Sequence, residues 1–340
     1  MSLILPRPAH KPRSGRSTRS GPVRQDRITI NRASAKVHTE ASFMSRPSPK
    51  PNIRKQQPAQ VEVVDPAWLV KALAFTVLAA LFCGYLTFCL LFYQGQWQLV
   101  LHPTRTTASP QSIAGIPYSL IYFGPDDSAI PQLTGWWIPS APGGRYANTT
   151  LLFLPGSDGS LVDSIPTLAT LHNLGINVFA FDYRGYGQSA ATHPNQQNMT
   201  HDADSAWQYL NTSRAIPAQQ IVLYGTGVGA SLATNLALSY VDSPALILDS
   251  PHADLLDTAL RDHRSNLVPV RLLFHERFPL AEPLSTLHTP KLLLSRATLP
   301  DQAFRTAANP KLTVELATPS EALYNQSLTR FLDEYVKPNV

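Results

Sequence analysis

The stretch IVLYGTGVGAS, residues 221–231, decides how the rest of the chain is interpreted. A run of apolar residues ends in a turn built on Gly225, Gly227 and Gly229, after which the residues favour a helix. Two kinds of site have this form. One is a strand-to-helix turn that carries a nucleophilic serine as G-x-S-x-G, and the other is a dinucleotide-binding turn written G-x-G-x-x-G/A. The sequence on either side has to distinguish them.

Outward from this turn, short apolar runs alternate with helical segments. The runs that predict strands are 118–123, 132–139, 149–156, 177–183, 220–225, 245–250, 291–295 and 311–317. Alternation of this kind predicts an α/β fold with a mostly parallel eight-stranded sheet, helices on both faces and an antiparallel first pair. We expect one domain over residues 118–340, preceded by an irregular lead-in at 95–117. A Pro-bounded, lid-like insert is expected at about 251–289.

The first 66 residues differ in composition from this domain. Many Lys and Arg residues precede residue 60 and only Asp26 and Glu40 oppose them there, whereas acids outnumber Lys and Arg from Trp97 onward. The tail is rich in Pro, Ser, Gln and Thr and poor in apolar residues, so burial cannot offset the entropy of ordering it. We therefore expect residues 1–66 to be disordered. Binding of nucleic acid is not expected, because fixing membrane topology accounts for the basic charge.

An apolar segment, WLVKALAFTVLAALFCGYLTFCLLFY at residues 68–93, follows the tail and carries a single charge, Lys71. As a helix it measures about 39 Å, which exceeds a hydrocarbon core of about 30 Å. It is too long and too far from the N-terminus for a cleaved signal peptide. We predict a single-pass signal anchor at 67–94 that holds the protein in the membrane through residues 68–93. By the positive-inside rule the tail is cytoplasmic and the domain is exported to the periplasmic or extracellular side.

Both cysteines, Cys83 and Cys89, fall in this segment, so the exported domain has no thiol for a disulfide, a metal site or a nucleophile. The histidines are scattered without metal-ligand spacing, and we infer neither a metal nor a cofactor. An alternative start at Met44 stays open, as do the host and the oligomeric state.

Four segments together resemble the α/β-hydrolase family, in particular its membrane-anchored, Bem46-like branch of serine-hydrolase-like proteins. They are LFLPGSDGS (152–160), VFAFDYRGYGQS (178–189), IVLYGTGVGAS (221–231) and LILDSPHADLLD (246–257). The resemblance implies an α/β-hydrolase fold and a descent from esterases, thioesterases or peptidases. It also implies a catalytic serine at the elbow, then an acid, then a histidine in chain order.

The residues at these three positions depart from the family pattern. The serine position is Gly227, the acid position falls near Leu299, and the histidine position is Pro319, with no histidine after His288. The catalytic triad is therefore degenerate. Weak substitutes are Thr226 as a nucleophile, Asp301 as a displaced acid and His252 as a rewired base, and the last residue follows the end of a strand. We expect Asp182 and Arg184 to brace their turn rather than to react.

The oxyanion-binding groups are better preserved than the triad, because the resemblance places the family's donors at the backbone N–H groups of Ser157 and Val228. The dinucleotide interpretation also has support, since Asp249 ends the next strand 24 residues after Gly225, as a ribose-binding acid does. The hydrolase landmarks before the turn favour an elbow without its serine. We expect a membrane-anchored pseudohydrolase that binds an unknown small-molecule or protein ligand. The alternative is an active serine hydrolase with a displaced nucleophile.

Overall fold

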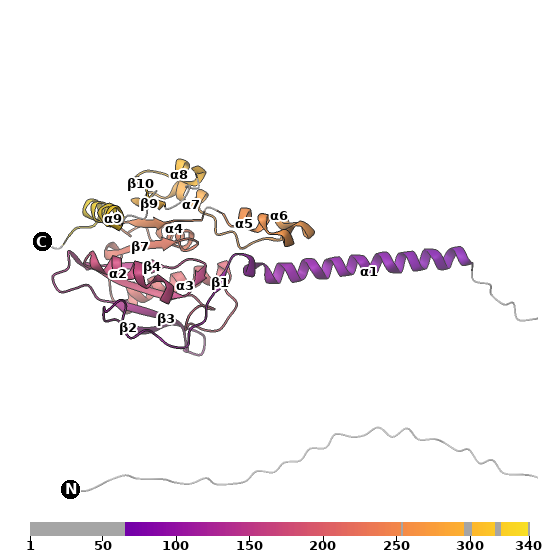
Figure 1. Cartoon of the computed structure of the whole chain (residues 1–340), viewed down its shortest axis with the longest axis horizontal. Helices are drawn as coiled ribbons and strands as arrows, with labels where there is room; N and C mark the ends of the chain where they lie inside the picture. Colours follow the sequence, from indigo (N-terminus) through magenta and orange to yellow (C-terminus); the bar gives the residue numbers. More distant parts are fainter. Residues whose placement is uncertain (1–64, 253, 296–300, 317–320, 339–340) are drawn as a thin grey trace, which may run out of the picture. The chain divides into compact units, whose positions relative to one another are not determined.

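The computed structural model describes residues 65–252, 254–295, 301–316 and 321–338. Residues 1–64 of the predicted tail lie outside these ranges, as do Leu299 and Pro319, whereas Asp65 and Pro66 belong to the start of the first helix. The first helix, α1, runs over Pro66–Gly95, and a short 3₁₀ turn, η1, continues it over Gln96–Leu99 (Figure 1).

Helix α1 begins where its sequence favours a helix start. The carboxylate of Asp65 accepts a hydrogen bond from the backbone N–H of Ala67 at 2.9 Å, and Pro66 supplies a first residue that needs no N–H partner. None of its residues is buried, and an 18-residue window within it has a mean hydropathy of 2.2. The predicted apolar helix, long enough to cross a membrane, is therefore confirmed by length and composition.

The domain is built on an eight-stranded sheet, as the alternation of apolar runs predicts. Its strands lie in the order β10-β9-β8-β7-β4-β6-β3-β2. Only β3 runs antiparallel to its neighbours β2 and β6, and the other pairs are parallel. The strands are β2 (Ser119–Pro125), β3 (Pro131–Ile138), β4 (Tyr146–Leu154), β6 (Ile176–Asp182), β7 (Ile221–Thr226), β8 (Leu246–Asp249), β9 (Lys291–Ser295) and β10 (Lys311–Glu315).

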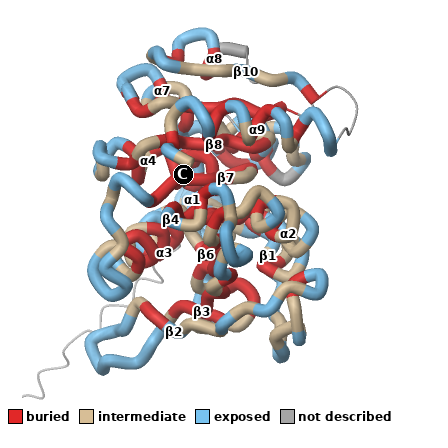
Figure 2. Tube along the Cα trace, turned by 90° about the vertical axis from the view of Figure 1, so that its left-hand side faces the viewer, coloured by how far each residue is buried: buried red, intermediate tan, exposed pale blue. Residues whose placement is uncertain are grey.

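Helices cover both faces of this sheet, and alternate side chains of each central strand serve the two faces. In β4, Leu152 and Leu154 pack with α3 (Gln196–Gln208) and α4 (Gly229–Ser239), while Leu151 and Phe153 pack with α2 (Ile165–Asn173) and α9 (Glu321–Tyr335). Figure 2 shows the result as buried strands between helices with exposed outer surfaces. The expected α/β-hydrolase architecture is confirmed.

The remaining elements are short and lie between these strands and helices along the chain. Part of the lead-in expected to be irregular forms a strand, β1 (His102–Pro103), which pairs in parallel with β5 (Asp158–Gly159). The lid-like insert contains α5 (Leu256–Arg261), η5 (His263–Leu267), α6 (Val270–Leu273) and α7 (Ala281–Thr286). The others are η2 (Leu161–Ser164), η3 (Tyr209–Ser213), η4 (Ala218–Gln220) and α8 (Asp301–Thr306).

Candidate functional site at the β7–α4 turn

The turn between β7 and α4 forms the sharp elbow that its glycines predict. Gly227 has φ +55°, in the left-handed region that glycine occupies at little cost. At Gly229 a Cβ would lie only 2.5 Å from the carbonyl oxygen of Pro155, so the first turn of α4 fits against the end of β4 only with glycine there. The elbow is thus complete in its backbone, and its tip has no side chain.

The imidazole of His252 lies over this tip. A Cβ built on Gly227 would stand 3.4 Å from Nδ1 of His252 and 3.5 Å from its Cε1. Two backbone hydrogen bonds hold the segments together, from the N–H of Gly227 to Asp249 at 3.3 Å and from the N–H of His252 to Gly227 at 3.2 Å. Ser250, with φ +48°, turns the chain between them. The ends of β7 and β8 therefore bring a histidine to the position that faces a nucleophile.

The loop after β4 forms the other wall of the site. Gly156 Cα lies 3.5 Å from the same Cβ position, and Ser157 is buried next to it. The carbonyl of Ser157 accepts hydrogen bonds from the Tyr186 hydroxyl at 2.9 Å and from the N–H of His102 at 2.8 Å. Among the described residues, no protein group accepts a hydrogen bond from the N–H of Ser157 or of Val228. Both amides therefore lack a protein acceptor within the described part of the chain, as the two donors of an oxyanion site do.

A second histidine stands at the rim of this loop. Nδ1 of His102 lies 2.7 Å from Oδ1 of Asp158, and the Oγ of Ser157 donates to Oδ2 of Asp158 at 3.4 Å. Both members of the His102–Asp158 pair are largely exposed. Sequence reasoning missed this pair, because only the parallel pairing of β1 with β5 brings residues so far apart in the chain together.

The carboxylate of Asp249 is hydrogen-bonded within the protein, which argues against its binding the ribose of a dinucleotide. It accepts hydrogen bonds from the Tyr224 hydroxyl at 2.7 Å and from the Ser250 hydroxyl at 2.9 Å, and the Tyr224 and Tyr324 hydroxyls lie 2.6 Å apart. Burial raises the pKa of Tyr224 well above its usual value, so the phenol stays protonated and donates to the carboxylate. Asp249 thus fixes the loop that carries His252.

The other sequence candidates contribute less to this site. Thr226 ends β7 and is half-buried. Asp301 begins α8, but its side chain lies outside the described part, as do the positions Leu299 and Pro319. His288 is exposed between α7 and β9. Within the described ranges, no group of three or more His, Cys, Asp or Glu side chains is arranged to hold a metal ion.

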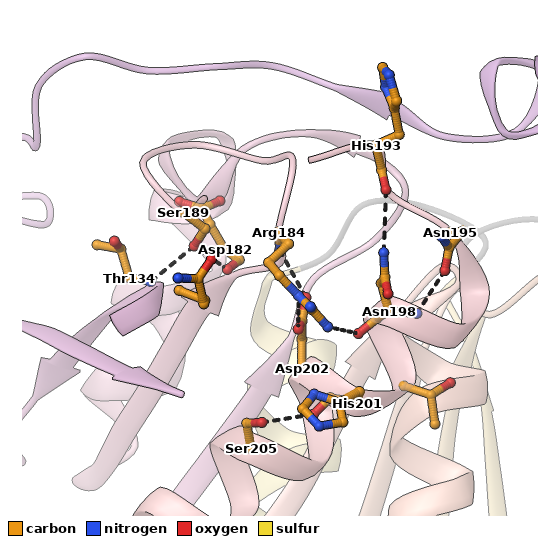
Figure 3. A network of polar contacts seen from close by, with 12 residues as sticks. Thr134, Asp182, Arg184, Ser189, His193, Asn195, Asn198, His201, Asp202 and Ser205 are labelled. Atoms are coloured by element: carbon orange, nitrogen blue, oxygen red, sulfur yellow. Dashed lines mark hydrogen bonds and ion pairs between the residues drawn. The ribbon is translucent and has the colours of Figure 1, made fainter. Parts of the chain in front are cut away.

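The turn after β6 has the bracing role predicted for it. Arg184 donates from its backbone N–H to Asp202 at 2.9 Å and from Nε at 2.6 Å, and Figure 3 shows this pair, with Asp202 midway along α3. Asp182 accepts from the N–H of Leu161 at 2.8 Å, and burial raises the pKa of this carboxyl to about 6. The hydroxyl of Ser189 donates to the carbonyl of Asp182 at 2.5 Å. These contacts tie the end of β6 and the turn after it to the start of η2 and to α3.

A groove of about 660 Å³ lies away from the elbow, at the start of α3. Its lining includes His201, Asp204, His275 and Glu276. The buried carboxylate of Glu276 accepts a hydrogen bond from the N–H of Gln196 at 2.5 Å, and its other oxygen lies 3.2 Å from Nε2 of His275. Burial raises the pKa of Glu276. The groove therefore belongs to the junction of α3 with the insert and not to the β7–α4 turn.

Comparison with known proteins points to hydrolases. A profile of the family described as serine aminopeptidase, S33, matches residues 148–318, half of the chain. An uncharacterized protein, MT2364, of Mycobacterium tuberculosis is 29% identical over 187 residues, which cover 53% of this chain and 64% of that protein. Alpha/beta hydrolase domain-containing protein 17C of Mus musculus is 33% identical over 162 residues, 46% of each chain. The chain thus spans about half to two thirds of the length of these curated relatives.

Solved structures show a similar fold at low sequence identity. The esterase Pf2001 of Pyrococcus furiosus superposes with a TM-score of 0.54 at 18% identity, over 69% of this chain and 99% of the esterase. An α/β hydrolase of Vibrio vulnificus gives a TM-score of 0.50 at 18% identity, over 69% of this chain and 96% of that protein. The residues matched by the family profile, 148–318, include the β7–α4 turn, the loop after β4 and His252.

Proposed function

Since the chain belongs to the α/β-hydrolase family, by its match to the serine aminopeptidase S33 profile, we propose that its domain binds a ligand at the old catalytic elbow without serine catalysis. The observation that carries this proposal is Gly227, which adopts the elbow conformation at φ +55° and offers no hydroxyl. Leu299 and Pro319 at the acid and histidine positions support the same conclusion. The finer assignment, a pseudohydrolase of the Bem46-like branch, is part of this proposal.

The chemistry left at the turn suits an oxygen-bearing ligand. The N–H groups of Ser157 and Val228 have no protein acceptor among the described residues, and the exposed imidazole of His252 lies beside the turn. Two amide donors and an imidazole favour a carbonyl or carboxylate oxygen, since helix starts and backbone amides stabilise negative charge. We propose an acyl or carboxylate compound as the ligand class.

We further propose that α1 anchors this domain to a membrane. Its length and mean hydropathy support a span, and Tyr93 and Trp97 stand where interfacial aromatics are common. The basic residues before residue 60 favour a cytoplasmic tail at 1–66, which would place the domain on the opposite side. Protease protection in sealed vesicles tests this orientation, because an exported domain is degraded only when the protease is on the side of the membrane opposite the cytoplasmic tail.

A second candidate function is an active hydrolase with a displaced nucleophile. The position of His252 favours it, because a histidine within reach of the elbow is the general base that serine chemistry needs. Thr226 precedes Gly227 in the turn, and Ser157 follows Gly156 on the facing loop, so both bear hydroxyl groups near the site. In that case one of these hydroxyls would attack the acyl carbon of an ester or amide while His252 accepted its proton, His252 would pass that proton to the alcohol or amine as its bond to the acyl group broke, and water would then release the acid.

The experiment that separates the two candidates uses the full chain in lipid nanodiscs. It is incubated with a fluorophosphonate probe and with nitrophenyl butyrate and palmitate. The binding proposal expects neither labelling nor turnover by the folded wild type. Labelling with turnover overturns it, and the modified peptide then identifies the displaced nucleophile.

Binding is tested separately at the amide of Val228. This residue has φ −70°, which a proline ring adopts, so Val228→Pro removes the N–H without demanding a new φ. Val228→Ala is the matched control, because it shortens the same buried side chain and keeps the N–H. With decanoate as the probe, the ligand-induced rise in melting temperature is expected to persist in Val228→Ala and to be lost in Val228→Pro. Equal shifts in both variants contradict the role of this amide.

A further inference from the structure

The lid-like insert exposes apolar side chains that its own packing does not use. Leu272, in α6, is 81% exposed, the largest value among the exposed large hydrophobic side chains of the described residues. Leu267, at the end of η5, is 66% exposed. Their neighbours Val268 and Val270 are buried in the core, so the segment is firmly packed while two leucines point outward. Exposed apolar side chains on a packed helical segment mark a contact surface.

Several contacts join this insert to the end of α1. Gln96 is buried and forms hydrogen bonds both with α1 and with the insert. Its Nε2 donates to the carbonyls of Tyr93 at 2.8 Å and of Leu273 at 3.2 Å, and its Oε1 accepts from the N–H of His275 at 2.7 Å. The rings of Tyr93 and His275 lie with centroids 4.7 Å apart. The insert therefore has a fixed position relative to the last turns of α1.

The length of α1 places this junction at the surface of a bilayer. The helix has 30 residues, which at about 1.5 Å each make roughly 45 Å, more than a hydrocarbon core of about 30 Å. The contacts of the insert involve the last two turns, where Cys89 and Phe92 pack against the domain core. Tyr93 and Trp97, in the same region, are residue types that concentrate at the headgroup level. If α1 spans the bilayer, an exposed apolar side chain at the depth of its last turns contacts lipid.

We infer that the surface formed by Leu267 and Leu272 docks on the bilayer next to α1, as a second membrane contact of the domain. This inference rests on the proposed anchoring by α1. Arg261 and Arg271 are exposed on the same insert and can reach anionic headgroups while the leucines enter the acyl region. Since Asp249 and His252 are hydrogen-bonded to the elbow and lead directly into this insert, the surface holds the candidate site close to the membrane. The ligand class then narrows to acyl compounds carried by the bilayer.

The test places a fluorophore at single cysteines in the full chain. Cys83 and Cys89 are the only cysteines, so Cys83→Ala and Cys89→Ala give a thiol-free background. Leu272→Cys is labelled with NBD in nanodiscs of phosphatidylcholine and phosphatidylglycerol. Doxyl-labelled lipid then serves as the quencher from the bilayer and iodide as the quencher from water. The expected result is a blue-shifted emission that doxyl lipid quenches and iodide does not.

Two control positions separate the possible failures. Val241→Cys replaces a side chain that is 75% exposed beyond the far end of α4, and iodide should quench it. Phe82→Cys lies within α1, and its quenching by doxyl lipid reports the anchor itself. If position 82 is quenched by lipid but position 272 is quenched by iodide, the docking surface is refuted and the anchor stands. Without lipid quenching at position 82, the anchoring and this inference fail together. Protection of position 272 from both quenchers assigns the surface to a protein partner, such as a second copy, and also overturns the proposal.

Discussion

Restoring a hydroxyl at the elbow is the most direct test of how the site is built. In Gly227→Ser the new Cβ would stand 3.4 Å from Nδ1 of His252. A hydroxyl that donates at about 2.8 Å with an angle near 110° at oxygen places its Cβ about 3.5 Å from the acceptor. The observed spacing therefore matches a serine–histidine hydrogen bond. The sequence offers His252 only as a weak substitute base, and its position over the elbow makes it the base expected for this variant.

The size of the effect follows from the same geometry. A side chain at φ +55° costs about 1–2 kcal/mol of folding free energy, and the nearest atoms leave room for the Cβ itself. For a domain of this size, we expect a fall in melting temperature of about 2–8 °C. A positioned base contributes about 10²–10⁴-fold to such reactions. Gly227→Ser should accordingly react with the fluorophosphonate probe, whereas the wild type is expected to resist it.

The assay is in-gel fluorescence of the full chain in nanodiscs, with the melting temperature measured on the same samples. Gly227→Ala carries the same backbone strain without a hydroxyl and should stay unlabelled. Adding His252→Ala to Gly227→Ser should reduce labelling at least about 100-fold if the imidazole is the base. A folded Gly227→Ser variant that resists the probe would refute the inferred geometry. Labelling that is unaffected by His252→Ala would refute the role of the histidine.

Three other predictions concern the scaffold. Lys291 is fully buried, and its ammonium donates to the carbonyls of Leu287 and Ala308 at 2.8 Å each. Lys291→Met should therefore lower the free energy of unfolding by about 1–3 kcal/mol in urea titrations. Lys311→Met, at a half-buried position, is the control and should lower it by less. Burial raises the pKa of Asp182 to about 6, above an unfolded value of about 4, so the native form binds the proton more tightly and stability should rise by up to about 3 kcal/mol as pH falls from 7 to 4. Asp182→Asn should remove that part of the slope in the same titrations. Gly229→Ala puts a methyl group against backbone carbonyls, and circular dichroism should show a loss of about 3 kcal/mol or more.

Local patterns sufficed to predict the fold. The runs at 149–156, 177–183 and 220–225 became β4, β6 and β7 within a few residues, because buried parallel strands are continuous in apolar residues. The lead-in was harder to predict. Its strand β1 has two residues, and it exists only because β5, more than fifty residues away, offers it a parallel partner. No local signal in the sequence encodes that pairing.

The site was predictable in its backbone and not in its side chains. The glycines at 225, 227 and 229 predict the elbow because local steric constraints require a residue without a side chain at such positions. The similarity of the loop at 152–160 to the family predicts the facing wall. The approach of His252 depends on the turn at Ser250 and on two hydrogen bonds between the ends of β7 and β8. Those contacts are set by the whole sheet, so the sequence offers His252 only as one candidate among several.

The elbow does not need its serine to persist. Its shape depends on the fit of Gly229 against the end of β4, on the hydrogen bond from Gly227 to Asp249, and on the Asp249–Tyr224 contact behind them. None of these involves a side chain at position 227. A glycine there also avoids the cost of about 1–2 kcal/mol that a serine pays for a positive φ. Such a turn is therefore stable without the nucleophile, and its presence in a chain of this family indicates the fold while the atoms around its tip decide the function. Here those atoms are two amides and an imidazole, a set that suits the oxygen-bearing ligand we propose and has no hydroxyl at position 227 to attack its carbon.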